Sequence, residues 1–159
     1  MSYAIASGIC LIVIVVFWQQ SGYAIVSAHG GLRWLLRGIF CVSLLGIIWG
    51  IWSLGRFDAF GLDPIRNSAR GSSAAPSRLM VRGPYRWVRH PLYSFCVLMI
   101  WSCPDLTADR LLFKILWTAW IVLGTVLEER DLAEQFGEEY RIYQSQVPML
   151  FPNQILPVR

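Results

Sequence analysis

The pattern of hydrophobic and polar positions divides the chain into long apolar segments separated by polar stretches. Residues 3–27 and 34–54 each supply the roughly 20 mainly apolar residues that a helix needs to cross a bilayer. A signal peptide cleaved after residues 26–28 is the alternative for the first segment. Such a peptide carries basic residues before its apolar run, and this one does not. We therefore expect two N-terminal membrane helices, the second with Gly46 and Gly50 at a small-xxx-small spacing that favours close helix packing.

The next two apolar segments predict a helical hairpin. Residues 92–103 are followed by Pro104 and Asp105, so this third helix covers only about 20 Å of a roughly 30 Å hydrocarbon core. After a tight connection, residues 111–127 make a fourth helix, in which Lys114 is expected to extend toward the outer end.

The hairpin returns the chain to the membrane face at which the third helix begins. Glu128 and Glu129, at the end of the fourth helix, are therefore expected near His90 and Tyr93. Ionisable groups attached to a membrane helix are costly unless they have a partner or a function. This pair of carboxyl groups is thus a candidate for a functional site.

An amphipathic helix is expected beyond residue 128. Its apolar face is formed by Leu132, Phe136, Tyr140 and Tyr143. Acidic residues occupy the other faces, and Val147-Pro148 ends the helix. The prediction is a surface helix that packs back on the bundle.

Residues 55–90 form the longest polar stretch. Its arginines are Arg56, Arg66, Arg70, Arg78, Arg82, Arg86 and Arg89, against only Asp58 and Asp63. Because cytoplasmic loops are rich in basic residues, we expect this loop on the cytoplasmic side of a bacterial inner membrane. The alternative is an arginine-rich loop that only anchors lipid headgroups.

Composition supports a membrane protein and excludes other classes. The chain of 159 residues is 55% hydrophobic and 15% charged, which is too apolar for an ordinary soluble domain. We expect a single membrane domain over residues 1–159. Nucleic acid is not an expected partner, because the net charge of +4 is concentrated in one loop. A metal site is not expected either, since His29 and His90 are far apart in the chain and no Cys-x-x-Cys pair is present.

The stretch 82–93 joins the basic loop to the third helix and reads Arg-Gly-Pro-Tyr-Arg-Trp-Val-Arg-His-Pro-Leu-Tyr. Gly83-Pro84 signals a turn, and the three arginines would form one positive stripe if the segment were helical. Proline favours the first position of a helix, so His90 is placed as the N-cap, beside free N–H groups and the positive end of the helix dipole. Such a position attracts anions.

Two blocks of sequence carry a resemblance to a known family. They are residues 83–93 and the set Glu128-Glu129, Phe136-Gly137-Glu138-Glu139-Tyr140, Tyr143 and Val147-Pro148. At this spacing the chain resembles the isoprenylcysteine carboxyl methyltransferase and phospholipid methyltransferase superfamily of membrane methyltransferases, over roughly residues 77–152.

The resemblance implies S-adenosyl-L-methionine as methyl donor, bound between the start of one helix, the end of its hairpin partner and the C-terminal segment. The cofactor-binding positions that carry over are Leu79, Met80, Tyr85, His90, Pro91, Leu92, Tyr93 and Glu128. A helix N-terminus suits the donor's carboxylate, Glu128 its ammonium or ribose hydroxyls, and Tyr85 or Trp87 its adenine. Glu129 and Arg89 are the candidate catalytic residues, because a thiol acceptor needs a proton acceptor and a nearby positive charge.

The methyl acceptor stays open at this point. Enzymes of the superfamily that act on prenylated cysteine have an arginine where this chain has Gly124, and a basic residue where it has Gln146. Residues 101–107 and 147–150 are more similar to membrane thiol S-methyltransferases. The alternatives are therefore a thiol, a carboxylate or a phospholipid amine, and beside these a non-catalytic membrane protein that keeps the fold.

The predicted fold is an all-α integral membrane protein with about four transmembrane helices, the last two a short helical hairpin, and a C-terminal amphipathic helix. Residues 3–54 hold two helices, residues 55–90 the basic loop and residues 91–159 the methyltransferase core. The expected location is a bacterial inner membrane, crossed several times, with the active site facing the cytoplasm. Membrane lipids and a lipophilic or small thiol or carboxylate acceptor are the expected partners.

Overall fold

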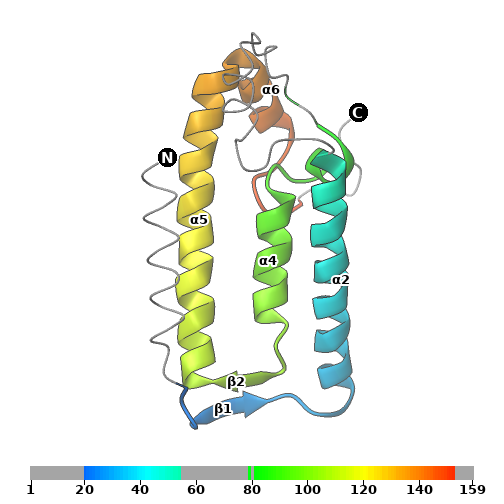
Figure 1. Ribbon diagram of the computed structural model, residues 1–159, viewed down its shortest axis with the longest axis vertical. Helices are drawn as coiled ribbons and strands as arrows, with labels where there is room; N and C mark the ends of the chain where they lie inside the picture. The colour runs from blue at the N-terminus through cyan, green and yellow to red at the C-terminus, as the bar shows by residue number, and fades with distance from the viewer. Residues whose placement is uncertain (1–19, 55–78, 80, 153–159) are drawn as a thin grey trace, which may run out of the picture.

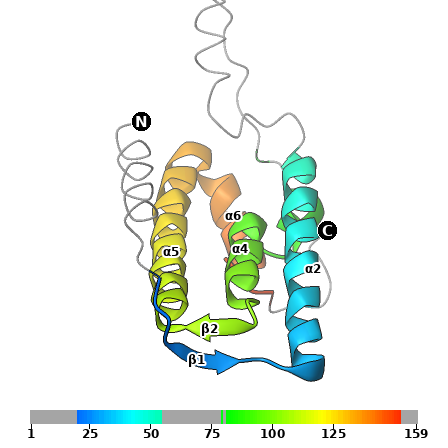
Figure 2. The same ribbon diagram turned by 60° about the horizontal axis from the view of Figure 1, so that its bottom comes forward.

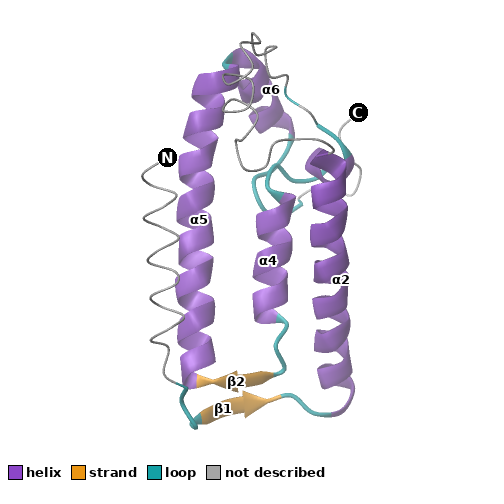
Figure 3. Cartoon of the chain, in the orientation of Figure 1, coloured by secondary structure: helices purple, strands orange, loops and turns teal. Residues whose placement is uncertain are grey.

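The computed structural model describes residues 20–54, 79 and 81–152, and these residues are mostly helical (Figures 1 and 3). The helices are α2 (Gly30–Leu54), α4 (Pro91–Trp101), α5 (Ala108–Phe136) and α6 (Glu138–Gln146). The other elements are a 3-10 turn, η1 (Gly83–Arg86), and two short strands, β1 (Ala24–Ser27) and β2 (Asp105–Thr107). Figures 1 and 2 show α4 between α2 and α5, with the two strands at one end of the helices and α6 at the other.

Two of these helices are long and apolar enough to cross a membrane, as judged by length and composition. They comprise Gly30–Ser53, with 24 residues, and Ala108–Phe136, with 29 residues. They correspond to the second and fourth helices expected from the sequence. The third, α4, has 11 residues, so it extends about 16 Å and is short as predicted. The expected first helix and most of the basic loop lie outside the described residues.

The strand β1 corrects the expected end of the first helix. Residues assigned to that helix, Ala24–Ser27, instead pair antiparallel with β2, so that Ala24 lies opposite Thr107 and Ser27 opposite Asp105. Arg33 fixes this end of the bundle, because its two terminal nitrogens donate to the two carboxylate oxygens of Asp105 at 3.0 and 2.9 Å. The hydrogen bonds from Arg33 hold the pKa of Asp105 below its usual range. The sequence pattern of β1 alone does not reveal these partners, which lie about 80 residues away.

Lys114 also departs from the expectation. Its side chain is buried, and its Nζ lies 5.6 Å from the centre of the Trp101 ring. The Trp101 indole N–H in turn donates to Thr118 Oγ1 at 3.0 Å. A cation over an aromatic face is stabilised without reaching water, which explains why the side chain does not extend outward.

A break at Gly137 corrects the expected amphipathic helix. The helix α5 continues through Phe136, and α6 begins only after Gly137, which has a φ of +58°. Glycine adopts this backbone conformation without the steric penalty of a side chain. The change of direction packs Tyr140, Tyr143 and Val147 into a buried cluster against partly buried residues of α5 and of the chain before η1.

The contact between α2 and α4 depends on two glycines, as their spacing predicted. A Cβ atom at Gly46 would lie 2.5 Å from the Phe95 ring, and one at Gly50 would lie 2.7 Å from Leu92. Real Cβ atoms essentially never approach so closely, so these positions admit the α4 side chains only because they are glycine. The start of α4 is thereby held against the end of α2.

This packing predicts opposite effects for two substitutions in α2. Gly46→Ala is expected to lower the free energy of unfolding by about 1–3 kcal/mol, because the ring of Phe95 must move. Gly38→Ala, which meets nothing within 4 Å, should raise it by up to about 1 kcal/mol through better helix propensity. Thermal unfolding of both variants in the same detergent measures the difference. Equal stabilisation by both would contradict the close contact.

Candidate functional site

The segment before α4 is a tight turn followed by irregular chain. Gly83 has a φ of +55°, and a Cβ atom there would lie 2.2 Å from Ser53 Oγ, so the turn passes directly over the end of α2. The predicted stripe of three arginines does not form, because η1 ends at Arg86 and no helix continues from it. Arg82 is exposed, whereas Arg89 turns inward to α5.

His90 is the N-cap of α4 and Pro91 its first residue, as predicted. The His90 side chain makes no capping hydrogen bond, and its ring is directed to α5 instead. The C-terminal segment lies along this helix start, since the N–H groups of Arg89 and His90 donate to the carbonyls of Pro148 and Met149 at 2.9 and 3.0 Å. The Ser94 hydroxyl adds a hydrogen bond to the carbonyl of Leu150.

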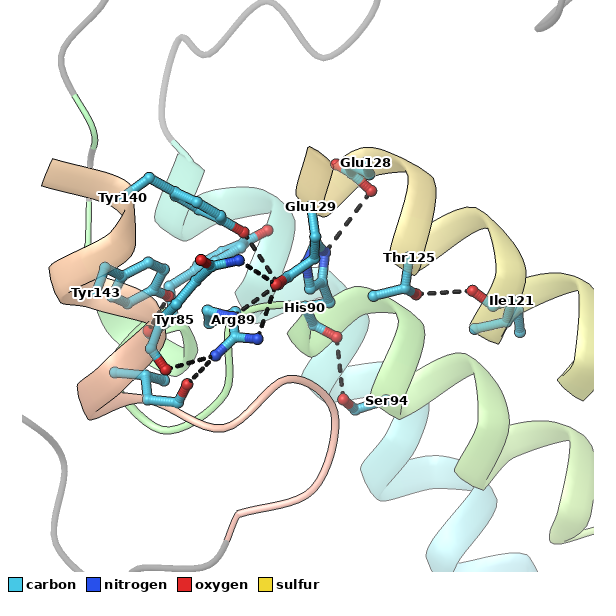
Figure 4. A network of polar contacts seen from close by, with 12 residues as sticks. Tyr85, Arg89, His90, Ser94, Ile121, Thr125, Glu128, Glu129, Tyr140 and Tyr143 are labelled. Atoms are coloured by element: carbon cyan, nitrogen blue, oxygen red, sulfur yellow. Dashed lines mark hydrogen bonds and ion pairs between the residues drawn. The ribbon is translucent and has the colours of Figure 1, made fainter. Parts of the chain in front are cut away.

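Glu129 is the centre of the polar network in Figure 4. Arg89 binds both of its oxygens, with Nε at 2.7 Å from Oε1 and Nη2 at 2.8 Å from Oε2. Tyr140 donates to Oε1 at 3.0 Å, His90 Nε2 lies 2.9 Å from the same oxygen, and Gln144 donates to Oε2 at 2.6 Å. The side chain of Glu129 is only 11% exposed, so its carboxylate has lost most of its contact with water. These hydrogen bonds and the ion pair with Arg89 compensate that loss.

Arg89 connects this network to the C-terminal segment. Its Nη1 donates to the carbonyl of Gln144 at 3.0 Å and also to the carbonyl of Val147. The guanidinium group of Arg89 therefore joins the end of α6 to α5, and the backbone N–H of Arg89 donates to the carbonyl of Pro148. The two residues proposed as catalytic, Arg89 and Glu129, are thus bonded to each other, and their catalytic role stays a prediction.

Glu128 has a different environment from its neighbour. Its side chain is 45% exposed, yet its Oε2 atom is buried and accepts no hydrogen bond from the residues that the structure describes. The imidazole ring of His90 lies beside it, with Nδ1 3.7 Å from Oε2 (Figure 4). The proximity of Glu128 to His90 confirms the geometry expected from the hairpin.

Three tyrosines besides Tyr140 lie near these carboxyl groups. Tyr93 stacks on the His90 ring at a centroid distance of 5.7 Å, and the Tyr143 hydroxyl donates to the backbone carbonyl of Tyr85 at 2.6 Å. Burial, together with the charge of Glu128, raises the pKa of Tyr85 to about 12. Tyr85 is therefore neutral at physiological pH, and it can donate a hydrogen bond or offer its ring to a ligand.

The structure brings most of the predicted cofactor-binding residues to this end of the bundle. They are Tyr85, His90, Pro91, Leu92, Tyr93 and Glu128. The side chain of Leu92 packs on Gly50, so only its backbone remains for a ligand. Leu79 packs on the cluster of Tyr140, Tyr143 and Val147, and Met80 lies outside the described residues.

The sequence pattern of α6 did not indicate its polar role. It assigned Tyr140 and Tyr143 to an apolar face and gave no role to Gln144, whereas Tyr140 and Gln144 both donate to Glu129. Their spacing by four residues places them on one helix face, which is the signal that could have revealed a shared partner. Burial and the charge of Glu129 raise the pKa of Tyr140, so this hydroxyl keeps its proton.

The site fits a zwitterionic ligand with an aromatic part. The buried Oε2 of Glu128 can accept from an ammonium or a hydroxyl group. The first turn of α4 leaves backbone N–H groups without intrahelical partners, and these suit a carboxylate. Tyr85 and Tyr93 offer aromatic rings. Within the described part of the chain, no three His, Cys, Asp or Glu side chains gather as a metal site.

The fold and the site define an α-helical membrane protein with a polar network at one end of its helices. The chain belongs to the phospholipid methyltransferase family, whose sequence model matches residues 33–139. This result agrees with the resemblance found in the sequence.

The chain is similar to several methanethiol S-methyltransferases. The one from Pseudomonas deceptionensis is 31% identical over 157 residues, which cover 96% of this chain and 58% of that protein. The one from Pseudomonas sp. (strain GM41(2012)) is 33% identical over 156 residues, which cover 96% of this chain and 59% of that protein. Methanethiol S-methyltransferase 1 from Bradyrhizobium diazoefficiens is 41% identical over 99 residues, 62% of this chain and 35% of that protein. The chain thus spans less than two thirds of these relatives, and no solved structure matches it significantly.

The ion pair between Arg89 and Glu129 yields a prediction about stability. Arg89→Met leaves a buried carboxylate without its cation and is expected to lower the free energy of unfolding by about 3–5 kcal/mol. Arg82→Met removes an exposed arginine of the same stretch and should change it by less than about 0.5 kcal/mol. Denaturant unfolding of the two variants in detergent makes the comparison. If the two variants unfold alike, Arg89 is not the residue that compensates Glu129.

Proposed function

We propose that this protein transfers a methyl group from S-adenosyl-L-methionine to a small thiol at the membrane interface. The observation that carries the proposal is the buried Oε2 of Glu128, which accepts no hydrogen bond from the described residues and lies beside His90 at the start of the short helix α4, in a chain of the phospholipid methyltransferase family. The similarity to methanethiol S-methyltransferases favours a thiol as acceptor. A phospholipid amine is the second candidate, supported by the family description.

The donor would be held by residues of α4, η1 and α5. The backbone N–H groups at Leu92 and Tyr93 would take its carboxylate, Glu128 its ammonium or ribose hydroxyls, and Tyr85 its adenine. When bound, it supplies an electrophilic methyl group attached to a positively charged sulfur. Leu79, Met80, His90 and Pro91 complete the proposed cofactor site.

The chain's own contribution is to position the two reactants. Arg89 fixes the C-terminal segment across the start of α4, and Glu129 fixes Arg89. Displacement at carbon depends strongly on alignment, so holding two reactants in one geometry supplies much of the acceleration. An apolar acceptor partitions into lipid and a charged donor stays in water, which favours a site at the interface. With the basic loop on the cytoplasmic side, the donor would arrive from the cytoplasm.

Donor binding and thiol methylation test the proposal together. Calorimetry on the detergent-solubilised protein should show donor binding that Glu128→Gln weakens by about 10- to 100-fold, the equivalent of one charge-assisted hydrogen bond. Glu134→Gln, at an exposed acid of the same helix, should leave it unchanged. Labelled donor should pass its methyl group to methanethiol, and in sealed vesicles only when it is supplied on the face that carries the basic loop. Methylation of lipid extract with no thiol product would instead assign the second candidate.

A matched substitution at Gly124 tests the choice between thiol and carboxylate. Gly124 lies one helical turn before Glu128, and a Cβ atom there would meet nothing within 4 Å, so a longer side chain has room. An arginine could hold an acceptor carboxylate with a charge-assisted hydrogen bond of about 1.5–3 kcal/mol. Gly124→Arg is therefore expected to raise turnover of a prenylcysteine analogue by about 10- to 100-fold relative to a thiol. Efficient methylation of that analogue by the unmodified protein would show that the absence of an arginine does not select the acceptor.

A further inference from the structure

The His90 ring is held by one of its two nitrogens. Its Nε2 lies 2.9 Å from Glu129 Oε1, an oxygen that also accepts from Arg89 and Tyr140. A carboxylate oxygen that is paired with a guanidinium group acts as an acceptor, so the hydrogen of this bond belongs to Nε2. In the neutral ring, Nδ1 then carries a lone pair.

Among the described residues, Nδ1 has a polar contact with Glu128. Glu128 Oε2 lies 3.7 Å from Nδ1, which is longer than a hydrogen bond, and this oxygen accepts no hydrogen bond from the described residues. In the neutral form of the ring, Nδ1 and this oxygen therefore share no hydrogen bond, and the neighbouring side chain that hydrogen-bonds Glu128 is Tyr93. One face of the ring is covered by Tyr93.

The charged and titratable groups around the ring come from every element packed against it. Glu128 and Glu129 lie on α5, Arg89 precedes the ring in sequence, Tyr93 lies on α4 and Tyr140 on α6. Arg89 offsets the charge of Glu129 through two hydrogen bonds. The charge of Glu128 remains on the Nδ1 side, where it stabilises a proton that arrives on the ring.

We propose that His90 Nδ1 is the proton acceptor for the thiol, and that Glu129 acts through His90 as a positioning residue. This inference rests on the proposed function, in which the acceptor is a thiol. The S–H bond breaks, its proton forms a bond to Nδ1, and its electron pair stays on sulfur as the lone pair that attacks the methyl carbon. The donor's carbon–sulfur bond then breaks with its pair on the donor sulfur, and the imidazolium returns the proton to water.

Glu129 is less suited to take the proton itself. Its oxygens accept hydrogen bonds from Arg89, His90, Tyr140 and Gln144, so a proton could reach the carboxylate only if one of these bonds broke. The histidine needs no such change at Nδ1. A base oriented by a second group through its other nitrogen is also the arrangement by which enzymes activate weak nucleophiles.

His90→Gln separates a proton acceptor from a residue that only binds the cofactor. The glutamine amide can still donate to Glu129, but its oxygen is a much weaker base than imidazole. With methanethiol we expect turnover to fall by about 100- to 10,000-fold. With 4-nitrothiophenol, which is already ionised at neutral pH, the loss should be less than about 10-fold. Both rates are compared at saturating donor, because His90 also belongs to the proposed cofactor site.

A matched control keeps the comparison specific. Tyr143→Phe removes a buried hydroxyl of the same end of the bundle, whose hydrogen bond goes to the backbone of Tyr85 and not to the His90 network. This variant should affect the two thiols equally. Equal losses for both thiols in His90→Gln at saturating donor would overturn the proposal and leave the proposed function standing. Methylation of neither thiol by the unmodified protein would overturn both.

Nitrogen-15 NMR of the histidine ring supplies a readout that does not depend on turnover. In the unmodified protein with donor bound at neutral pH, His90 should be neutral with its hydrogen on Nε2. Glu129→Gln should disturb this tautomer, whereas Tyr143→Phe should not. A ring protonated on both nitrogens, or a hydrogen on Nδ1 alone, would rule out Nδ1 as the acceptor.

Discussion

The ion pair between Arg89 and Glu129 is the interaction on which the rest of this end of the molecule depends. Burial of two charges is costly, and it is tolerated only when further hydrogen bonds satisfy both groups. Here Tyr140 and Gln144 of α6 donate hydrogen bonds to the Glu129 carboxylate. The carbonyls of Gln144 and Val147 accept hydrogen bonds from the Arg89 guanidinium group. The need to compensate one buried carboxylate therefore fixes α6 and the C-terminal segment against α4 and α5.

The same constraint separates the roles of two adjacent glutamates. Successive residues of a helix point in directions about 100° apart, so Glu129 faces the interior while Glu128 is directed to the partly exposed side. Glu129 has its hydrogen-bonding capacity filled, whereas Glu128 keeps a buried oxygen without a hydrogen bond from the described residues. His90 lies between them and contacts both, which makes it the link between the structural network and the proposed ligand site.

The packing of α4 explains why the site lies where it does. Gly46 and Gly50 admit Phe95 and Leu92, and Gly83 lets the preceding turn pass over Ser53, so the start of the short helix is fixed against the end of α2. Because α4 has only 11 residues, both of its ends lie close to other chain segments: the C-terminal segment at one end and the strands at the other. A short helix thus brings its N-terminal N–H groups to the level of Glu128.

The sequence by itself determined the features that local patterns control. Apolar length predicted about four transmembrane helices, and two of the described helices are long and apolar enough to cross a membrane. Proline placed His90 as an N-cap, and hairpin geometry brought Glu128 near it. Only the tertiary structure decided that Arg89 leaves the expected stripe to bind Glu129, that residues 24–27 pair as a strand, and that α6 contributes donors. The physical reason is that periodicity and caps act within a few residues, whereas the partner of a buried charge or of a strand N–H group is chosen among segments that meet only after folding.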